Sequence, residues 1–424
     1  MRESISKRLK KADPAVANIL AQEILRQEET LDLIASENIA SPEVRELVGS
    51  VLANKYSEGY PGRRYYPGNV NVDAIETLAQ NRARKAFHLN QAWHVNVQSY
   101  SGSPANIAVF LGLMKPGEKL MGMALASGGH LTHGHKVSAS GILFRSVAYG
   151  VDQKTGLIDY NEVERIAQKE KPRLIVSGLT AYPRAIDFKK FGAIAKKVGA
   201  YHVADISHIA GLIAAGLHPS PFPYADVVTT TTHKILRGPR GAVIFTKQQA
   251  ISNKRHGANI SDKIDRAVFP GLQGGPHDNV TAAIAYTFGR VATPAYKKYA
   301  RLVLENAKAL AQVLIEEGFT LVTGGTANHM MLLDLRPLGL NGFEAEKLLE
   351  RTGIIANRNS IPGDASPFRP SGIRLGTPAI TTRGLRPRHM PQIAQWFSRV
   401  LIGGENPEKV GREVKKFLTK LPVN

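Results

Sequence analysis

The sequence contains no cysteine among its 424 residues. This absence excludes disulfides, thiolate metal sites and cysteine nucleophiles. Long apolar runs are also missing: no stretch approaches the length of a membrane span. The basic segment MRESISKRLKKADPAVANIL has neither an uninterrupted apolar core nor a small-residue cleavage site. We therefore expect a soluble, cytoplasmic protein that has no membrane partner.

Acidic residues are scarce relative to basic ones. The chain has 35 Asp and Glu but 55 Lys and Arg, which gives a formal net charge of +20. A basic surface attracts anions, including nucleic acid, by long-range steering. The basic residues are nevertheless dispersed, without interleaved aromatic residues and without a nucleic-acid-binding motif. We interpret them as a solvated surface and do not expect functional nucleic-acid binding.

Hydrophobic residues make up 43% of the chain, as in ordinary globular proteins, and the length allows one large domain and a smaller one. In the first two-thirds, predicted helices over 105–114 and 160–168 alternate with predicted strands over 173–177 and 201–204. This is the βαβ pattern of a parallel sheet covered by helices.

After the Gly/Pro-rich stretch 269–276 the pattern changes to that of a smaller α+β domain. It predicts a helix over 295–318, strands near Leu321 and over 330–335, and helices over 388–401 and 407–421. We therefore predict an N-terminal helical arm (1–30), a large domain (31–285) and a small C-terminal domain (286–424).

A single lysine, Lys234, lies in the connection between two β-branched runs, 225–230 and 242–245, within TTTTHKILRGPRGA. A loop lysine is ordinarily a solvated surface residue. Its interpretation therefore depends on four other features of the sequence.

The first feature is the small-residue turn 99–106, Ser-Tyr-Ser-Gly-Ser-Pro-Ala-Asn, which opens a helix. The free N–H groups of a helix start suit a phosphate, although the same residues also read as a plain N-cap. The second feature is Asp205, at the end of a predicted buried strand, where ligands of open α/β sheets bind. Its cationic partner is either a structural arginine or a protonated heterocycle.

The third feature is Arg374, placed within an apolar strand of the small domain. It either forms a structural salt bridge or binds a carboxylate through two parallel hydrogen bonds. The fourth is the segment 128–135, with three histidines. A metal site is one reading, but no carboxylate or cysteine accompanies the histidines, so we favour an imidazole stacked on a flat cofactor and expect no metal.

Together these features describe a pyridoxal phosphate (PLP) site. It would combine a phosphate-binding turn at 99–106 (the phosphate cup), the strand-end Asp205, Lys234, and Arg374 as the ligand of a carboxylate. The lysine would form the Schiff base, the aspartate would keep the pyridine nitrogen protonated, and the arginine would hold the carboxylate of an amino acid.

Over nearly its whole length, the sequence resembles the serine hydroxymethyltransferases (glycine hydroxymethyltransferases). These are fold type I PLP enzymes. The resemblance is carried by the motifs at 33–38, 54–60, 64–66, 128–134, 229–241, 273–276 and 374–381. It implies an α/β large domain with a mostly parallel seven-stranded sheet, and a smaller C-terminal α+β domain.

The resemblance also implies roles for individual residues. The catalytic set would be Lys234, Glu58, Asp205, His130 and Tyr66. The cofactor would contact Ser101, Gly102, Ser103, His130, Asp205, His208, Lys234, Tyr56 and a second subunit's Gly274. The amino acid would contact Ser36, Tyr66, Arg374 and the second subunit's Tyr56 and Glu58. The folate would contact Tyr65, Leu125, Gly128, Gly129, Leu131, Asn359 and Phe368.

The implied reaction is the reversible transfer of the serine hydroxymethyl group to tetrahydrofolate through a PLP aldimine, giving glycine and 5,10-methylenetetrahydrofolate. Glu58 would handle the hydroxyl proton or stabilise the aldehyde. The implied assembly is a homodimer with shared active sites, alone or paired into a tetramer.

Four positions depart from the family pattern. Tyr100 replaces a histidine, Ile235 a threonine or serine, Ala242 a glycine, and Ala327 an acid. These departures leave open a PLP-dependent β-hydroxy amino-acid aldolase or an α-methylserine hydroxymethyltransferase. A non-enzymatic anion-binding protein is the third class of function that we consider.

Overall fold

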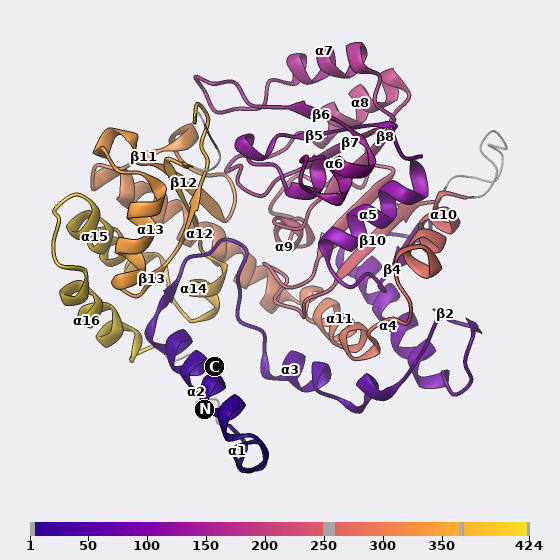
Figure 1. The fold of residues 1–424 in the computed structure, drawn as a ribbon, viewed down its shortest axis with the longest axis horizontal. Coiled ribbons are helices and arrows are strands. Elements are labelled where there is room, and N and C mark those ends of the chain that lie inside the picture. Colours follow the sequence, from indigo (N-terminus) through magenta and orange to yellow (C-terminus); the bar gives the residue numbers. More distant parts are fainter. Residues whose placement is uncertain (1–4, 249–258, 365, 367–368, 422–424) are drawn as a thin grey trace. The chain divides into compact units, whose positions relative to one another are not determined.

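The computed structural model describes residues 5–248, 259–364, 366 and 369–421. The chain forms two compact units. The large unit is Ala40–Arg301, and the small unit combines the described parts of Met1–Ile39 and Leu302–Asn424. The predicted division at residues 30 and 285 stays a prediction. Figure 1 shows both units, with elements labelled where there is room.

The large unit contains a seven-stranded sheet in the order β4-β10-β9-β8-β7-β5-β6. The neighbouring strands from β9 to β6 are parallel, whereas β10 is antiparallel to both β4 and β9. The predicted mostly parallel seven-stranded sheet is therefore confirmed. The strands are β4 (Trp93–Asn96), β5 (Lys119–Met123), β6 (Arg145–Tyr149), β7 (Leu174–Gly178), β8 (Tyr201–Asp205), β9 (Val227–Thr231) and β10 (Ala242–Lys247).

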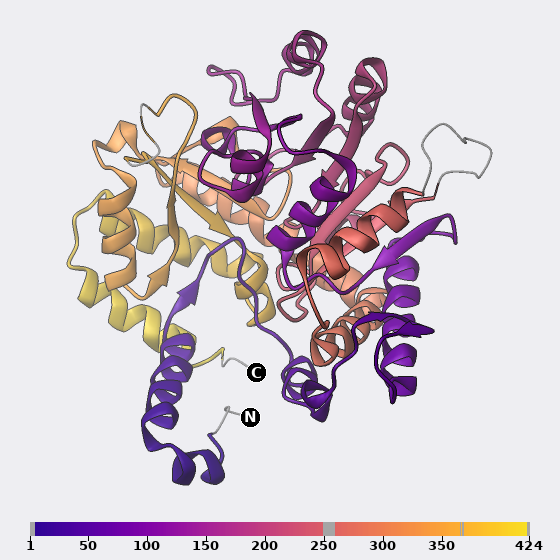
Figure 2. The same cartoon turned by 45° about the vertical axis from the view of Figure 1, so that its right-hand side comes forward.

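Alternation along the strands sends side chains to both faces of this sheet. Leu174, Val176 and Val203 belong to one apolar cluster with residues of α5 (Gly102–Leu113) and α10 (Ile260–Arg266). His202, which precedes Val203 in β8, points to the opposite face of the sheet, where its ring stacks on Phe191 of α8 (Phe188–Val198). Helices thus cover both faces of the sheet, as Figures 1 and 2 show.

The remaining elements of the large unit include a short hairpin, β2 paired with β3. They are α3 (Pro42–Val48), β2 (Gly59–Tyr60), β3 (Arg63–Arg64), α4 (Val70–Ala86), α6 (Ala139–Leu143), α7 (Tyr160–Glu170), α9 (Ala210–Ala214) and α11 (Asp278–Val291). The helices predicted over 105–114 and 160–168 correspond to α5 and α7, and the strands predicted over 173–177 and 201–204 to β7 and β8.

The small unit has a four-stranded antiparallel sheet in the order β11-β12-β15-β14. Its strands are β11 (Thr320–Leu321), β12 (Met330–Asp334), β14 (Asn357–Asn359) and β15 (Gly372–Gly376). Its helices are α1 (Lys7–Ala12), α2 (Pro14–Glu29), α13 (Gly342–Arg351), α14 (Pro378–Thr382), α15 (Met390–Leu401) and α16 (Pro407–Leu418). The helix α12 (Pro294–Glu316) runs in sequence from the large unit into the small one.

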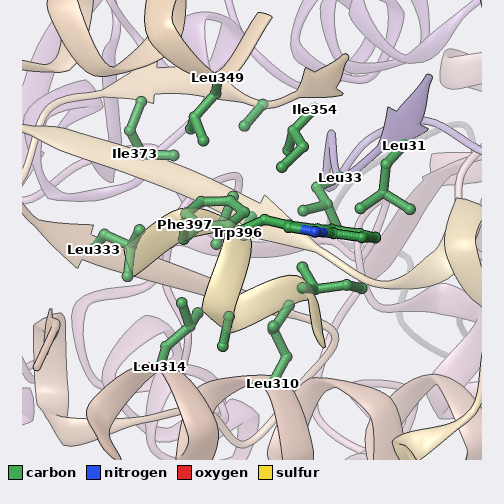
Figure 3. Packing of buried hydrophobic residues seen from close by; sticks show 14 of the residues in the cluster. Leu31, Leu33, Leu310, Leu314, Leu333, Leu349, Ile354, Ile373, Trp396 and Phe397 are labelled. Carbon is green, nitrogen blue, oxygen red and sulfur yellow. The ribbon is translucent and has the colours of Figure 1, made fainter. Parts of the chain in front are cut away.

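The N-terminal segment is built into the core of the small unit. Strand β1 (Leu31–Asp32) pairs in parallel with β13 (Ile354–Ile355). Leu31 and Leu33 are fully buried in a cluster with residues of α12, α13 and α15. Figure 3 shows this cluster, with Trp396 and Phe397 at its centre. No helix among the described residues is long and apolar enough to cross a membrane.

Candidate active site

Lys234 lies in the connection between β9 and β10, as the sequence predicts, but it is not on the surface. Only 9% of its area is exposed. The connection folds back on itself, because the N–H of Gly238 donates to the Thr232 carbonyl oxygen (2.7 Å) and the Thr232 hydroxyl donates to the carbonyl of Pro239 (2.6 Å). A lysine held inside a hydrogen-bonded turn is not a solubilising residue.

Asp205 ends β8, next to Thr229 of β9 in the parallel register. Its Oδ2 accepts hydrogen bonds from Asn106 Nδ2 (2.8 Å) and His133 Nε2 (3.2 Å), and its Oδ1 accepts the Ser207 N–H (3.0 Å). Burial alone would raise the pKa of Asp205, but other contributions, of which the hydrogen bond from His133 is the largest, hold that pKa well below its usual range. The buried carboxylate is therefore ionised.

Two histidines of the segment 128–135 lie near this carboxylate and differ in their contacts. The Nδ1 of His133 accepts the His130 N–H (3.2 Å), so the hydrogen of its ring is on Nε2 and points to Asp205. Burial lowers the pKa of His130 to about 4, so its imidazole is neutral at pH 7. The charges of Asp205 and Lys234 both act on His130, which places the three side chains close together. The described residues contain no group of three or more His, Cys, Asp or Glu side chains that could hold a metal.

The N-terminus of α5 fits the phosphate cup that the sequence predicts. Ser101 is the N-cap, and its side chain makes no capping hydrogen bond. A Cβ on Gly102 would come within 2.6 Å of Thr231 Cγ2, so the helix start packs directly against the end of β9. The buried hydroxyl oxygens of Ser99 and Thr231 have no hydrogen-bond partner among the residues that the structure describes. Unpaired hydroxyls beside free helix N–H groups suit the acceptor oxygens of a phosphate.

The other cofactor candidates lie in the same unit. His208 is buried, and the hydroxyl oxygen of the neighbouring Ser207 accepts the Thr231 N–H (3.1 Å), whereas Ser103 is exposed in the first turn of α5. The donor set of the large unit therefore fits PLP: a buried lysine, an ionised strand-end carboxylate, a neutral imidazole and a phosphate cup.

A second cluster in the large unit joins Tyr56, Glu58, Tyr66 and Gly274. The rings of Tyr56 and Tyr66 meet edge to face with centroids 5.3 Å apart. The negative charge of Glu58 raises the pKa of Tyr66. A Cβ on Gly274 would lie 3.2 Å from Glu58 Oε1 and 3.8 Å from the Tyr56 hydroxyl. These four residues therefore form one group within a single chain.

The candidates for folate binding in the large unit lie on short turns around Gly128 and Gly129. Gly128 has a φ of +100°, and a Cβ on Gly129 would lie 2.0 Å from the Met123 carbonyl oxygen, so neither position admits a side chain. Leu125 is half-buried, whereas Leu131 and Tyr65 are exposed. The chain thus presents two exposed apolar or aromatic side chains at the predicted folate positions.

Three of the described candidates belong to the small unit. Arg374 lies in β15, where burial lowers its pKa to about 10 and its Nε donates to Asn357 Oδ1 (3.2 Å). The segment that carries Ser36 runs beside the end of the same strand, because the Gly376 N–H donates to the Leu33 carbonyl oxygen (2.8 Å). Asn359 ends β14. Phe368 lies outside the described residues.

Asn106, Thr132 and His133 complete the network around Asp205, and the sequence predicts no separate role for any of them. Asn106 donates to both Asp205 and the Thr132 hydroxyl, and it accepts a hydrogen bond from Thr229. A signal was present, since Asn106 follows the Ser-Gly-Ser-Pro turn and His133 lies in the three-histidine segment. However, nothing in the sequence alone connects either residue with Asp205.

Comparison with known proteins identifies the family. The family model for serine hydroxymethyltransferase matches residues 9–397. The chain belongs to the serine hydroxymethyltransferase family. It is 51% identical over 419 residues to the serine hydroxymethyltransferase of Desulfotalea psychrophila, covering 98% of this chain and 95% of the relative.

Two further relatives agree with this assignment. The serine hydroxymethyltransferase of Phenylobacterium zucineum is 52% identical over 420 residues, covering 97% of this chain and 95% of the relative. That of Coprothermobacter proteolyticus is 51% identical over 414 residues, covering 97% and 96%. Serine hydroxymethyltransferases are PLP-dependent enzymes, and the resemblance stated from the sequence motifs is confirmed.

Proposed function

We propose that this chain reversibly transfers the hydroxymethyl group of serine to tetrahydrofolate, giving glycine and 5,10-methylenetetrahydrofolate. The observation that carries the proposal is the buried Lys234 beside the ionised Asp205 and the neutral His130, in a chain of this family. When bound, PLP would supply a ring that withdraws electrons from the α-carbon of an amino acid.

The residues of the large unit would hold and orient that ring. Lys234 would attach its aldehyde carbon, and the Asp205 carboxylate, fixed by Asn106 and His133, would keep a proton on the pyridine nitrogen. His130 would cover one face of the ring, since an uncharged imidazole stacks on it without repelling the proton. Ser101, Gly102 and Ser103 would bind the phosphate, and His208 would contact the ring near its phenolic oxygen.

The substrate would be held by its charged groups. Arg374, assisted by Ser36, would bind the carboxylate of serine through its guanidinium fork. Glu58 would accept the hydroxyl proton as the hydroxymethyl carbon leaves, or stabilise the aldehyde, with Tyr66 beside it. Tyr65, Leu125, Gly128, Gly129, Leu131, Asn359 and Phe368 would contact the folate.

The active sites would be shared between the subunits of a homodimer, with Tyr56, Glu58 and Gly274 acting in the site of the partner subunit. These three residues form one group with Tyr66 in this chain, so the four residues would enter one site together. Tyr66 is therefore assigned to the same site as Glu58. We also propose a cytoplasmic location for the dimer or for a tetramer built from it.

Serine cleavage measured with and without tetrahydrofolate tests the proposed reaction. We expect a yellow protein whose cleavage of serine depends strongly on folate, and in which borohydride reduction fixes the cofactor to Lys234. Brisk cleavage of serine that added folate leaves unchanged would instead identify an aldolase. Preference for α-methylserine over serine would identify the methylserine enzyme.

A further inference from the structure

Tyr100 is one of the four departures from the family pattern, and it makes three contacts with a single loop. Its N–H donates to Gln273 Oε1 (3.0 Å), and its hydroxyl donates to the carbonyl oxygen of Gly275 (2.7 Å). Its ring stacks on His277 with centroids 4.1 Å apart and an interplanar angle of 3°. The loop 273–277 is thus attached to the residue that precedes the phosphate cup.

The same loop supports the residues proposed to meet the substrate. A Cβ on Gly274 would lie 3.2 Å from Glu58 Oε1, and a Cβ on Gly275 would lie 3.4 Å from the Tyr56 ring. The backbone of the loop is therefore the surface on which Tyr56 and Glu58 rest. Any displacement of Gly275 would move that surface.

Two further anchors hold the loop at its ends. At its start, Gln273 Nε2 donates to the Gln98 carbonyl oxygen (2.8 Å). At its end, Asp278 begins α11, and its Oδ1 accepts the Ser57 hydroxyl (2.7 Å). Tyr100 holds the middle of the loop, where both glycines lie and where the backbone has the most conformational freedom.

We propose that Tyr100, with His277 as its stacking partner, is a positioning residue that fixes the Gly274–Gly275 backbone and thereby the places of Glu58 and Tyr56. The proposal rests on the proposed function, which makes Glu58 the group that handles the serine hydroxyl proton. A carboxylate that is misplaced by a fraction of an ångström loses rate without losing substrate binding. Serine would remain held through its carboxylate by Arg374.

Tyr100→Phe tests this proposal, because it removes the bond to the Gly275 carbonyl and keeps the ring. Tyr149→Phe is a matched control: the Tyr149 hydroxyl also donates to a backbone carbonyl, that of Val176 (3.0 Å), in the interior of the large unit. His277→Ala removes the stack and keeps the hydrogen bond. Hydrogen–deuterium exchange of amides 273–278 in cofactor-free protein is measured beside kcat and KM for serine.

We expect exchange over 273–278 to accelerate about 3- to 10-fold in Tyr100→Phe and His277→Ala but not in Tyr149→Phe. The kcat of both loop variants should fall by a similar factor, with KM for serine within about twofold of wild type. The proposal would be overturned if exchange over 273–278 in Tyr100→Phe is no faster than in Tyr149→Phe. It would also be overturned if Tyr100→Phe exchanges faster but keeps the kcat of wild type. A wild type that lacks folate-dependent cleavage contradicts the proposed function instead, and the exchange data still show whether Tyr100 holds the loop.

Discussion

Arg374 is buried in β15, and its Nε donates to Asn357 Oδ1. Arg374→Lys keeps a positive charge but loses the planar fork. We expect serine binding to weaken by about 2 to 4 kcal/mol while PLP stays bound. Isothermal titration with serine, and the absorbance of the cofactor, measure the two effects.

Arg383→Lys is the control for this prediction. Arg383 is also largely buried in the small unit, but its guanidinium donates to backbone carbonyls, including those of Thr30 and Leu421. Its replacement should lower stability and leave the affinity for serine unchanged. Serine affinity within twofold of wild type in Arg374→Lys would make Arg374 a structural residue.

Asp32 and Glu37 form a carboxyl pair in the segment that carries Ser36. Burial first, and then the charge of Glu37, raise the pKa of Asp32 from 3.8 to about 7. Between these values the folded chain binds more protons than the unfolded chain, so this group's contribution to stability falls as the pH rises. The free energy of unfolding of Asp32→Asn, relative to that of wild type, should therefore be about 1 to 3 kcal/mol higher at pH 7.5 than at pH 4.5.

Urea unfolding of both proteins at the two pH values measures this gap. Glu37→Gln should also be stabilised relative to wild type more at pH 7.5 than at pH 4.5, because it removes the charge that raises the pKa of Asp32. The double variant should be little more stable than Asp32→Asn, because the two carboxyl groups act on each other. A stability difference between Asp32→Asn and wild type that is the same at both pH values would show that the pKa of Asp32 is not raised in the folded state.

At the residue scale, the sequence predicts those members of the site whose neighbours in the chain reveal them. Asp205 follows an apolar strand, and Lys234 lies between two β-branched runs, so both can be recognised locally. Asn106 and His133 reach Asp205 from positions 99 and 72 residues away in the chain. Contacts over such separations depend on the order of the strands, which local patterns do not contain.

At the scale of elements, the start of α5 depends on a glycine. A Cβ on Gly102 would lie 2.6 Å from Thr231 Cγ2, so Gly102→Ala must move either the helix start or the end of β9. Because the phosphate cup lies at this junction, we expect the affinity for PLP to fall by about tenfold or more, with a smaller effect on unfolding. Fluorescence titration of the apoprotein with PLP measures the affinity.

Gly49→Ala provides the control for this element, because an added Cβ there would meet its nearest atom, the Arg45 carbonyl oxygen, at an ordinary 3.5 Å. It should bind PLP as wild type does. If Gly102→Ala also binds PLP with wild-type affinity, the start of α5 does not hold the phosphate.

The elements themselves were predicted best where a helix or strand is strongly patterned. The helix predicted over 295–318 is α12, and those predicted over 388–401 and 407–421 are α15 and α16, each within a few residues. The antiparallel direction of β10 was not predicted, because the turn after Lys234 reverses the chain without a change in the apolar pattern of the strand. The pairing of β1 with β13 joins segments more than 300 residues apart, and two-residue strands carry no periodicity.

At the scale of the whole molecule, the shared active site can be tested by mixing two inactive variants. A two-fold dimer repeats its interface, so each dimer would contain two composite sites. Glu58→Ala and Lys234→Ala should each be nearly inactive alone. When they are unfolded and refolded together in equal amounts, roughly half of the dimers are mixed, and one of the two sites in each mixed dimer is intact.

Recovered activity should then approach roughly a quarter of wild type. Native mass spectrometry establishes the fraction of mixed dimers, and wild type carried through the same refolding corrects for losses. Mixed dimers without activity above that of the separate variants would place Glu58 and Lys234 in different sites or in the same chain's site.

The small unit is assembled from both ends of the chain, and this has a consequence for the order in which the protein can be made. Leu31 and Leu33 pack against residues of α15 such as Trp396, so the apolar side chains of the first forty residues must wait until the last helices have been translated. At about 5 to 20 residues per second, that delay is on the order of 20 to 70 seconds. The large unit ends at Arg301, so it is fully translated before this delay is over, whereas Leu31 and Leu33 lack their packing partners until the last helices have been made.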